Sequence, residues 1–427
     1  MSNWKTVPLG QLCEIKIGGT PSRAEPKFWA TEKQLGFPWV SISDLREKVV
    51  FDTQEEITVA GVRSSNVKLI PRDTVLMSFK LTIGRVARAG RDLYTNEAIA
   101  AFVPKSSNLN IDYLFHTLPS VASSGIADTA VKGATLNKAK LINLLLPLPE
   151  SAEQNTIASV LNQVDTVIDH TESLISKYQS IKQGMMHDLF TRGVDENGEL
   201  RPPYEEAPEL YKKTELGWVP KDWDESPLLD VVPKAEYGIS VSLDDGHGIP
   251  VLRMNNLENG LMKLDDLKYC TSPEAGELRL CDGDVLFNRT NSLEHVGKTA
   301  IWQGELPLAS FASYLVRLVP TKEKLLPDFL NLWLNRAEIQ TRIRQFATPG
   351  VHQVNINPTN LRRVEMARPR QIDEQKKIVA RVSDVLKIIE SETACLIKLQ
   401  AIKSGLMHDL LSGKVRVPFT QSNQKAA

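Results

Sequence analysis

The chain contains nearly the same ten residues twice, as IKQGMMHDLF at residues 181–190 and IKSGLMHDLL at residues 402–411. The two copies lie 221 residues apart (402 minus 181), which is about half of the 427-residue chain. The match continues backwards at this offset, without a gap, to Glu153 and its counterpart Glu374. A recurrence of this length at one fixed offset indicates a repeated structural unit.

Weaker matches extend the repeat into the earlier part of each half. The paired stretches are residues 37–45 with 249–257, 73–79 with 283–289, 83–87 with 296–300, and 111–115 with 327–331. The sequence therefore predicts two copies of one unit. Each copy has a globular part that has diverged, followed by a helix that has diverged less.

Apolar residues in alternating steps of four and three predict one long helix in each copy, over residues 151–192 and 371–413. This spacing, held over about five heptads, is typical of a coiled coil rather than of a helix lying on a sheet. Two such rows in one chain most simply bury each other, and we call them the helix-pair seam. Its residues are Ile157, Leu161, Val164, Ile168, Ile175, Tyr178, Met185, Leu189, Ile378, Val382, Val385, Ile389, Leu396, Leu399, Leu406 and Leu410.

The rest of each copy mixes short strand-like and helix-like apolar runs, which predicts small α/β domains. The predicted fold class is an α/β (α+β-like) two-domain repeat with pseudo-twofold symmetry. Two globular domains would be separated by two long antiparallel helices that form a coiled coil. The predicted boundaries are 1–150 for the first globular domain, 151–192 for the first helix, 193–220 for a linker, 221–370 for the second globular domain, 371–413 for the second helix, and 414–427 for a C-terminal tail.

The composition gives only broad bounds on function. The net charge of −1 does not indicate a nucleic-acid binder, so any DNA-binding face must come from local clusters of basic residues. The chain has no apolar run of membrane-spanning length and no apolar signal region at its start, which predicts a soluble, cytoplasmic protein. Its four cysteines lack the spacing of a zinc site and are predicted to be free thiols.

Three motifs come close to enzyme signatures and fall short. Residues 292–299 (SLEHVGKT) end like a phosphate-binding loop but have Ser292 at the first glycine position. Residues 201–204 (RPPY) resemble the Asn/Asp-Pro-Pro-Tyr motif of amino-methyltransferases, but an arginine cannot accept the hydrogen bond that the target amine donates. His187 and His408, each followed by an aspartate, are interpreted as residues at helix ends. No nucleophile, base and orienting group come together, so the chain is predicted to be non-catalytic.

Several motifs together carry a family resemblance. They are LPLPESAEQNTIASVL (146–161) and RPRQIDEQKKIVARV (368–382), which open the two helices, and TELGWVPKDW (214–223), which leads into the second globular part. The order globular, helix, globular, helix covers essentially the whole chain. The chain resembles the specificity subunit of a type I restriction–modification system.

This resemblance implies two target recognition domains, each reading one half of a bipartite site in double-stranded DNA. The helix pair would set the spacing between the halves and dock two modification subunits, which are adenine methyltransferases. A restriction and translocation subunit would join for cleavage. S-adenosylmethionine, ATP and Mg would all be held by these partners, and this chain itself would need no cofactor or metal.

Candidate DNA contacts follow from the side chains that read base edges, such as arginine for guanine and asparagine or glutamine for adenine. We expect them after the equivalent strands at 75–79 and 285–289, in the turns after 37–45 and 249–257, and in the glycine loops before each closing strand. These residues are Ser43, Ser78, Lys80, Thr82, Arg85, Lys132, Thr135, Arg253, Asn255, Asn256, Arg289, Thr290, Asn291, Ser292, Lys298, His352 and Gln353.

Two other classes of function stay open at this point. One is a stand-alone DNA-binding or scaffold protein with the same architecture and no methyltransferase partner. The other is a nucleotide-hydrolysing enzyme built on Lys298, for which loss of ATP hydrolysis in Lys298→Ala would be the deciding observation.

Overall fold

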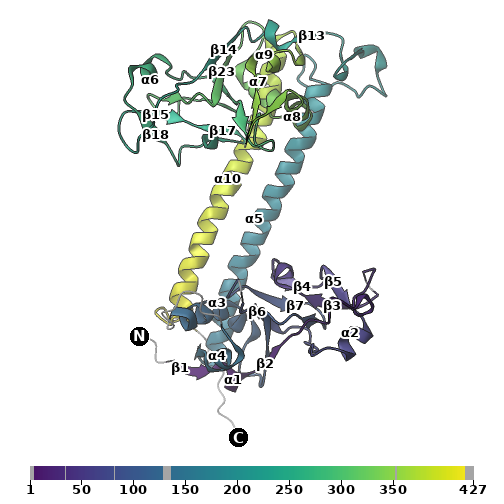
Figure 1. Cartoon of the computed structure of the whole chain (residues 1–427), viewed down its shortest axis with the longest axis vertical. Coiled ribbons are helices and arrows are strands. Elements are labelled where there is room, and N and C mark those ends of the chain that lie inside the picture. Colours follow the sequence, from purple (N-terminus) through teal and green to yellow (C-terminus); the bar gives the residue numbers. More distant parts are fainter. Residues whose placement is uncertain (1–3, 34, 81, 128–135, 352, 419–427) are drawn as a thin grey trace. The chain divides into compact units, whose positions relative to one another are not determined.

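The computed structural model describes residues 4–33, 35–80, 82–127, 136–351 and 353–418. The chain divides into two compact units (Figure 1). Unit 1 comprises Met1–Ser173 and Thr393–Ala427, and unit 2 comprises Leu174–Glu392. Each unit thus contains one globular part, a segment of the first long helix and a segment of the second.

The main sheets of the two units have the same strand order. In unit 1 the order is β2-β9-β6-β7-β4, and in unit 2 it is β14-β23-β19-β21-β17, with β16 added at the edge. In both units the pairing of the last two shared strands is parallel and the other shared pairings are antiparallel. The strands of unit 1 are β2 (Cys13–Ile17), β4 (Val49–Val50), β6 (Val75–Ser78), β7 (Val86–Ala89) and β9 (Ile99–Pro104). Those of unit 2 are β14 (Lys234–Tyr237), β16 (Leu257–Glu258), β17 (Gly260–Met262), β19 (Val285–Asn288), β21 (Thr299–Ile301) and β23 (Leu315–Val319).

Two smaller sheets are also duplicated, β5-β3-β8 with β18-β15-β22 and β1-β10 with β13-β26. Their strands are β1 (Lys5–Pro8), β3 (Phe37–Val40), β5 (Glu55–Ile57), β8 (Tyr94–Thr95), β10 (Leu145–Leu148), β13 (Trp223–Pro227), β15 (Ile249–Leu252), β18 (Lys268–Cys270), β22 (Ser310–Phe311) and β26 (Glu365–Pro369). This shared topology shows that the weak sequence matches between the globular parts reflect a common fold.

Short helices surround these sheets. They are α1 (Leu9–Leu12), α2 (Val59–Arg63), α3 (Ile111–Ala127) and α4 (Lys138–Asn143) in unit 1, and α6 (Pro273–Glu277), α7 (Pro327–Leu334), α8 (Ala337–Arg344) and α9 (Pro358–Leu361) in unit 2. The mixture of strands and helices in each unit confirms the predicted α/β class.

Long helices occupy both predicted positions, α5 over Ser151–Thr191 and α10 over Ile372–Leu411. A glycine with positive φ follows the end of each helix, Gly193 (φ 63°) and Gly413 (φ 67°), in the left-handed conformation that ends many helices. Within the described residues, no helix combines the length and the apolar character of a membrane span.

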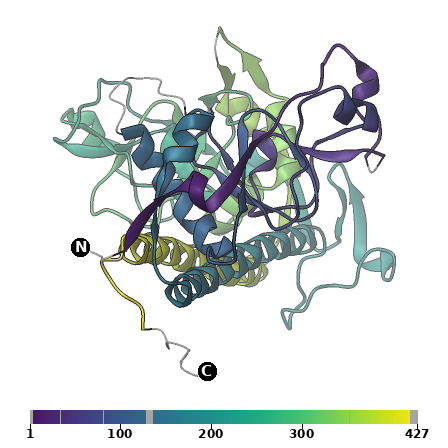
Figure 2. The ribbon, with the colours of Figure 1, turned by 90° about the horizontal axis from the view of Figure 1, so that it is seen from below.

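Within each unit, a segment of α5 lies beside a segment of α10 (Figure 2). In unit 1, Ile157 and Leu161 near the start of α5 share a buried cluster with Leu410 near the end of α10. In unit 2 the roles are exchanged, because Leu189 at the end of α5 clusters with Ile378 near the start of α10. The beginning of one helix therefore packs with the end of the other in each unit.

The residues of the helix-pair seam are all buried or half-buried. Its residues Ile157, Leu161, Ile168, Leu189, Ile378, Val382, Val385 and Leu410 are buried. The others are half-buried: Val164, Ile175, Tyr178, Met185, Ile389, Leu396, Leu399 and Leu406. The buried positions concentrate toward the helix ends, where the globular parts contribute additional apolar cover.

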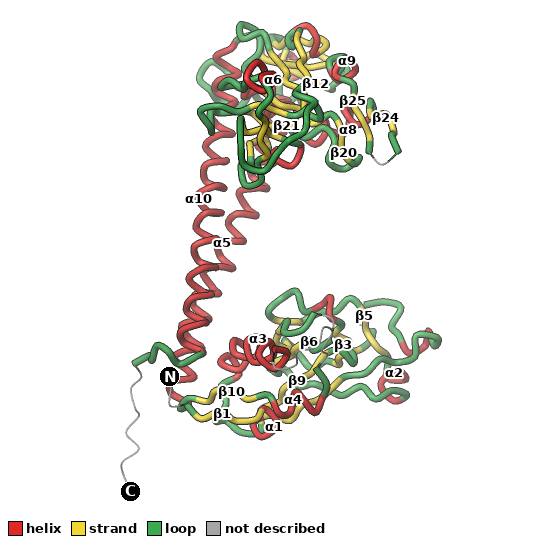
Figure 3. Tube along the Cα trace, turned by 60° about the vertical axis from the view of Figure 1, so that its left-hand side comes forward, coloured by secondary structure: helices red, strands yellow, loops and turns green. Residues whose placement is uncertain are grey.

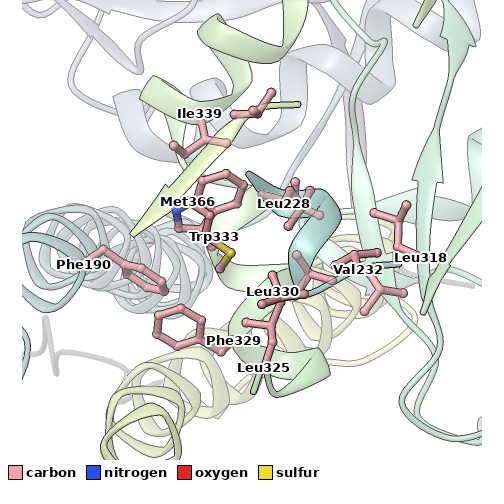
Figure 4. Close-up of a cluster of buried hydrophobic side chains, with 14 of the residues drawn as sticks. Phe190, Leu228, Val232, Leu318, Leu325, Phe329, Leu330, Trp333, Ile339 and Met366 are labelled. Carbon is pink, nitrogen blue, oxygen red and sulfur yellow. The ribbon is translucent and has the colours of Figure 1, made fainter. Parts of the chain in front are cut away.

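Figure 4 shows how the end of α5 enters the core of unit 2. The Phe190 ring of α5 lies 4.7 Å, centroid to centroid, from the Phe329 ring of α7. Trp333 of α7 and Met366 of β26 are buried in the same cluster. A large buried aromatic of this kind contributes several kcal/mol, so the helix end is part of the domain core.

The Glu-Gln pair that opens each long helix joins it to its globular part. The buried carboxylate of Glu374 accepts hydrogen bonds from Arg201 Nη1 at 2.6 Å, Val194 N at 3.0 Å and Trp223 Nε1 at 3.1 Å. In unit 1, Glu153 accepts from Trp4 Nε1 at 3.1 Å and Arg416 Nη2 at 2.8 Å. We call each Trp–Glu–Arg set a clasp.

The neighbouring glutamines make matching bonds. Gln154 Nε2 donates to the carbonyls of Asn108 and Pro149, and Gln375 Nε2 donates to those of Lys324 and Pro369. The side-chain oxygen of each accepts a backbone N–H at 2.9 Å. These equivalent contacts explain why the Glu-Gln pair recurs in both copies, because both of its side chains are satisfied inside the fold.

The segment at 193–220, predicted to be a linker, forms an ordered arm of unit 2. It contains the antiparallel hairpin β11 (Tyr211–Thr214) and β12 (Gly217–Pro220). Val194, Tyr211 and Val219 are buried. Arg201, the arginine of the RPPY stretch, reaches Glu374 from this arm, so that stretch has a structural role as part of a clasp.

Candidate nucleic-acid interface

The strongest group of predicted contact residues follows β19 in unit 2. Here β20 (Thr290–Asn291) pairs with β25 (Val354–Ile356), which also pairs with β24 (Ala347–Pro349). Figure 3 shows these three short strands together beside α8. The structure thus brings the loop after β19 next to the glycine loop that precedes the closing strand.

Arg289 is held in this group by several neighbours. Its Nη2 donates to Asn355 Oδ1 at 2.8 Å, and its guanidinium carbon lies 5.1 Å from the centre of the Tyr237 ring. Its buried Nε has no hydrogen-bond partner among the described residues. A guanidinium fixed in this way loses less side-chain freedom when it binds a ligand.

Sequence reasoning missed Asn355, Tyr237 and Tyr314 at this site. Tyr237 ends β14, and the backbone carbonyl of Tyr314, just before β23, accepts from Arg289 N at 3.0 Å. Both tyrosine residues are about half exposed, at 48% and 49%. A tyrosine beside a strand is the signal that could have found the two aromatic residues, since aromatic side chains often stack on the bases of nucleic acids.

The remaining predicted residues of this group divide by exposure. Ser292, Lys298 and Gln353 are exposed and Asn291 is half-buried, whereas the Thr290 side chain is buried. In the GKT stretch at 297–299, Gly297 ends a turn and Thr299 begins strand β21. A phosphate-binding loop leads into a helix instead, so the structure gives no support to a nucleotide site at Lys298. His352 lies outside the described residues.

A second group follows β15, where a short 3-10 helix covers Met254–Asn256. The carboxylate of Asp266 accepts from Arg253 Nη2 and Asn255 Nδ2, both at 2.8 Å. Asn256 is buried, and its amide donates to the carbonyls of Lys263 and Asp266, so this residue shapes the turn. In the equivalent turn of unit 1, Ser43 Oγ lies 2.7 Å from Ser41 Oγ.

In unit 1 the turn between β6 and β7 exposes Lys80, Thr82 and Arg85. Ser78 is fully buried, and its hydroxyl donates to the carbonyls of Thr82 and Arg85, so it holds the turn rather than pointing outward. Lys132 and Thr135 lie outside the described residues.

These groups supply the chemistry that DNA recognition requires. Lysine and arginine cations bind phosphates, and arginine, asparagine and glutamine carry the paired donors and acceptors that read base edges. Among the residues that the structure describes, no cluster of His, Cys, Asp or Glu has the arrangement of a metal site. His187 and His408 are exposed near the helix ends, and His187 Nδ1 lies 3.9 Å from Glu338.

Comparison with known proteins agrees with this architecture. The family described as the type I restriction modification DNA specificity domain matches the chain twice, over residues 1–178 and 220–401. The MjaVIII specificity subunit of Methanocaldococcus jannaschii is 24% identical over 97% of this chain and 93% of its own length. The MjaX specificity subunit, described as putative, from the same organism is 29% identical over 48% of this chain. The match spans only 49% of that relative's length. The EcoKI specificity subunit of Escherichia coli K12 is 25% identical over 90% of the chain and 82% of its own length.

Solved structures share the fold of the whole chain. The S subunit of a type I restriction–modification system from M. genitalium superposes with a TM-score of 0.59 at 14% identity, covering 98% of this chain and 97% of that one. A second structure, described in terms of complex assembly and conformational transition of the type I R-M system, gives a TM-score of 0.54 at 15% identity, covering 96% and 98% of the two chains. With the family matched in both halves, the chain belongs to the type I restriction–modification DNA specificity subunits.

Proposed function

We propose that this chain is the non-catalytic sequence-recognition subunit of a type I restriction–modification complex, and that each unit reads one half of a bipartite DNA site. The observation that carries the proposal is a shared sheet topology with different loop residues. The equivalent turns present Lys80, Thr82 and Arg85 in unit 1 and Arg289 and Asn291 in unit 2. Two domains that share one fold but carry different loop residues are suited to reading two different half-sites.

The helix pair docks two adenine-methyltransferase modification subunits and sets the spacing between the half-sites. Two pairs of apolar residues on the long helices support the docking role. Val167 and Ile388 are counterparts at the repeat offset, as are Ile181 and Ile402. All four are exposed, by 48%, 37%, 40% and 53%. Equivalent exposed apolar residues in both copies suit one kind of partner bound twice.

The chemistry of the complex then lies in the partners. The modification subunits supply S-adenosylmethionine, and a restriction and translocation subunit supplies ATP and Mg. The residues of this chain contribute positioning: cations on phosphates, and fixed donors and acceptors on base edges.

We expect Arg289→Ala and Lys80→Ala to weaken DNA binding in different ways. Loss of the fixed Arg289 fork should cost about 1–3 kcal/mol of discrimination at one base pair. Loss of the exposed Lys80 charge should weaken all sequences about equally and reduce the salt slope by about one. The measurement is fluorescence anisotropy of the assembled complex, with a duplex selected from a random pool, at several salt concentrations.

Lys322→Ala is the matched control, because this exposed lysine lies outside the predicted loops. It should leave both affinity and discrimination unchanged. If neither Arg289→Ala nor Lys80→Ala differed from this control, the two loops would not belong to the DNA interface.

A further inference from the structure

Unit 1 contains a polar cluster where its globular part meets the helix pair. The side chain of Asp165, on α5, is 9% exposed. Its Oδ1 lies 2.6 Å from Lys403 Nζ of α10 and 3.2 Å from Lys48 Nζ, and Lys48 also bonds to Asp169 at 2.6 Å. Burial alone would raise the pKa of the Asp165 carboxyl, but the two ammonium groups outweigh this effect and lower it. Both lysines are therefore paired within the chain.

The repeat locates the equivalent positions in unit 2. At the helix offset of 221 residues, Lys403 corresponds to Lys182 and Asp165 corresponds to Leu386. His116, which bonds to Asn162 at 2.8 Å in the unit 1 cluster, corresponds to Leu332 through the matched stretches 111–115 and 327–331. The lysine has been kept, while the carboxylate and the histidine have been replaced by leucines.

Strand register identifies the counterpart of Lys48. Val49 of β4 pairs with Arg88, and Leu261 of β17 pairs with Ile301. Arg88 pairs in turn with Val75 of β6, and Ile301 pairs with Val285 of β19. Val75 and Val285 are equivalent in the matched stretches 73–79 and 283–289. Val49 and Leu261 are thus equivalent, and the residue before each is Lys48 in unit 1 and Gly260 in unit 2. A long side chain that crosses to α5 in unit 1 has no equivalent in unit 2.

These replacements leave a pocket of about 420 Å³ in unit 2. Its lining includes Lys182, Gly260, Leu332, Arg336, Val382 and Leu386. The half-buried Lys182 ammonium has no hydrogen bond or ion pair within the described part of the chain, and burial lowers its pKa. The carboxylate on the lining, Glu338, lies 3.7 Å from Arg336 and 3.9 Å from His187.

The lining mixes polar and apolar side chains, and Lys182 is an unpaired cation among them. Such a pocket calls for an anionic occupant, because a half-buried charge without a partner is costly. Unit 1 shows which anion this lysine position accommodates, namely an aspartate carboxylate. Two exposed apolar residues are close to these positions in sequence. Ile181 directly precedes Lys182, and Ile388 follows Leu386 by two residues. Apolar residues beside an unpaired cation match a protein segment that carries an acidic side chain next to apolar ones.

We propose that the unit 2 pocket receives an aspartate or glutamate side chain of a docking protein, which pairs with Lys182 and replaces the internal carboxylate that unit 1 supplies through Asp165. This inference rests on the proposed function, under which the docking protein is the modification subunit. It makes the two docking positions chemically different, since only unit 2 takes its carboxylate from the partner.

The test compares Lys182→Met with Lys177→Met, an exposed lysine five residues earlier on the same helix. The modification subunit is titrated into each full-length chain by calorimetry, and the stoichiometry is followed by native mass spectrometry. We expect Lys182→Met to weaken one of the two binding events by at least about tenfold, with the other unchanged, because a buried charge pair loses one member. Lys177→Met should bind like the parent.

Stability of the isolated chain separates binding from folding. Lys182→Met should leave the thermal unfolding midpoint unchanged or raise it, since it removes an unpaired half-buried charge. Binding lost together with a lowered midpoint would assign Lys182 a structural role and overturn the inference. Parental binding by Lys182→Met would also overturn it, whereas failure of the parent chain to bind would refute the proposed function instead.

A free small anion is the competing occupant. Sodium acetate and inorganic phosphate are added to the isolated parent chain and to Lys182→Met while unfolding is followed. If either anion raised the midpoint of the parent alone, and Lys182→Met still bound two modification subunits normally, the pocket would be a small-anion site and not a docking site.

Discussion

Glu374→Ala should lower the free energy of unfolding of unit 2 by about 3–5 kcal/mol, because it removes the acceptor from a buried clasp. The Arg201 side chain is only 13% exposed and would keep Asp222 as its remaining carboxylate partner. The Trp223 indole N–H and the Val194 amide both donate to Glu374. In the variant these two groups would lose their acceptor inside the fold. Unsatisfied buried donors carry their full desolvation cost.

Hydrogen–deuterium exchange read by mass spectrometry measures this effect for each unit separately. Peptides from Leu174–Glu392 should lose protection in Glu374→Ala, while those from Met1–Ser173 keep it. Glu196→Ala is the matched control, because Glu196 is exposed and lies in the same arm. A change of less than about 1 kcal/mol in Glu374→Ala, as at an ordinary surface position, would show that the clasp does not stabilise unit 2.

Exchange of residues 1–148 for those of a related specificity subunit should change one half of the DNA site completely and leave the other half as it was. The cut is placed so that β1 and β10 are exchanged together, because these strands pair with each other. The donor should carry a tryptophan at position 4, so that the bond to Glu153 survives. The readout is selection of bound duplexes from a random pool by the assembled complex.

The reciprocal exchange of residues 221–370 is the control for the first and should change only the other half. If a single exchange altered both halves, the two units would not read DNA independently. Loss of binding in both exchanges, with normal assembly of the complex, would also contradict separate half-sites.

Sequence reasoning predicted the features that follow from the regular spacing of apolar residues along the chain. The helix-pair seam is a row of apolar residues at fixed spacing, so the long helices could be placed from the sequence alone. The strand order could not be placed in this way, because it depends on pairings such as Val75 with Phe102 that periodicity does not encode. The repeat indicated that both halves share one order without giving that order.

Long-range polar contacts escaped prediction for a similar reason. Arg201 lies in a Pro-rich stretch that local composition assigns to a linker, yet its partner Glu374 is 173 residues further along the chain. Lys48 and Asp165 are likewise far apart in sequence and meet only in the folded unit. No local pattern reveals which charged residue will be buried by a distant element.

The structure shows which side chains of the predicted interface are used within the fold itself. The sequence prediction includes Ser78 and Asn256 because their side chains can hydrogen-bond, but the fold uses these groups on its own backbone. It omits Asn355, which holds Arg289 across the sheet β20-β25-β24. Hydrogen-bonding capacity alone does not tell a turn-forming residue from one that faces a ligand.

The central claim is that two units of one fold read two halves of one site for a modification partner. Its most direct test is genome-wide mapping of methylated adenines in a host with and without this gene, with the modification subunit present in both. The account predicts a motif of two fixed halves separated by a non-specific spacer, present only with the gene. A continuous motif, or a methylation pattern unchanged by deletion of the gene, would contradict it.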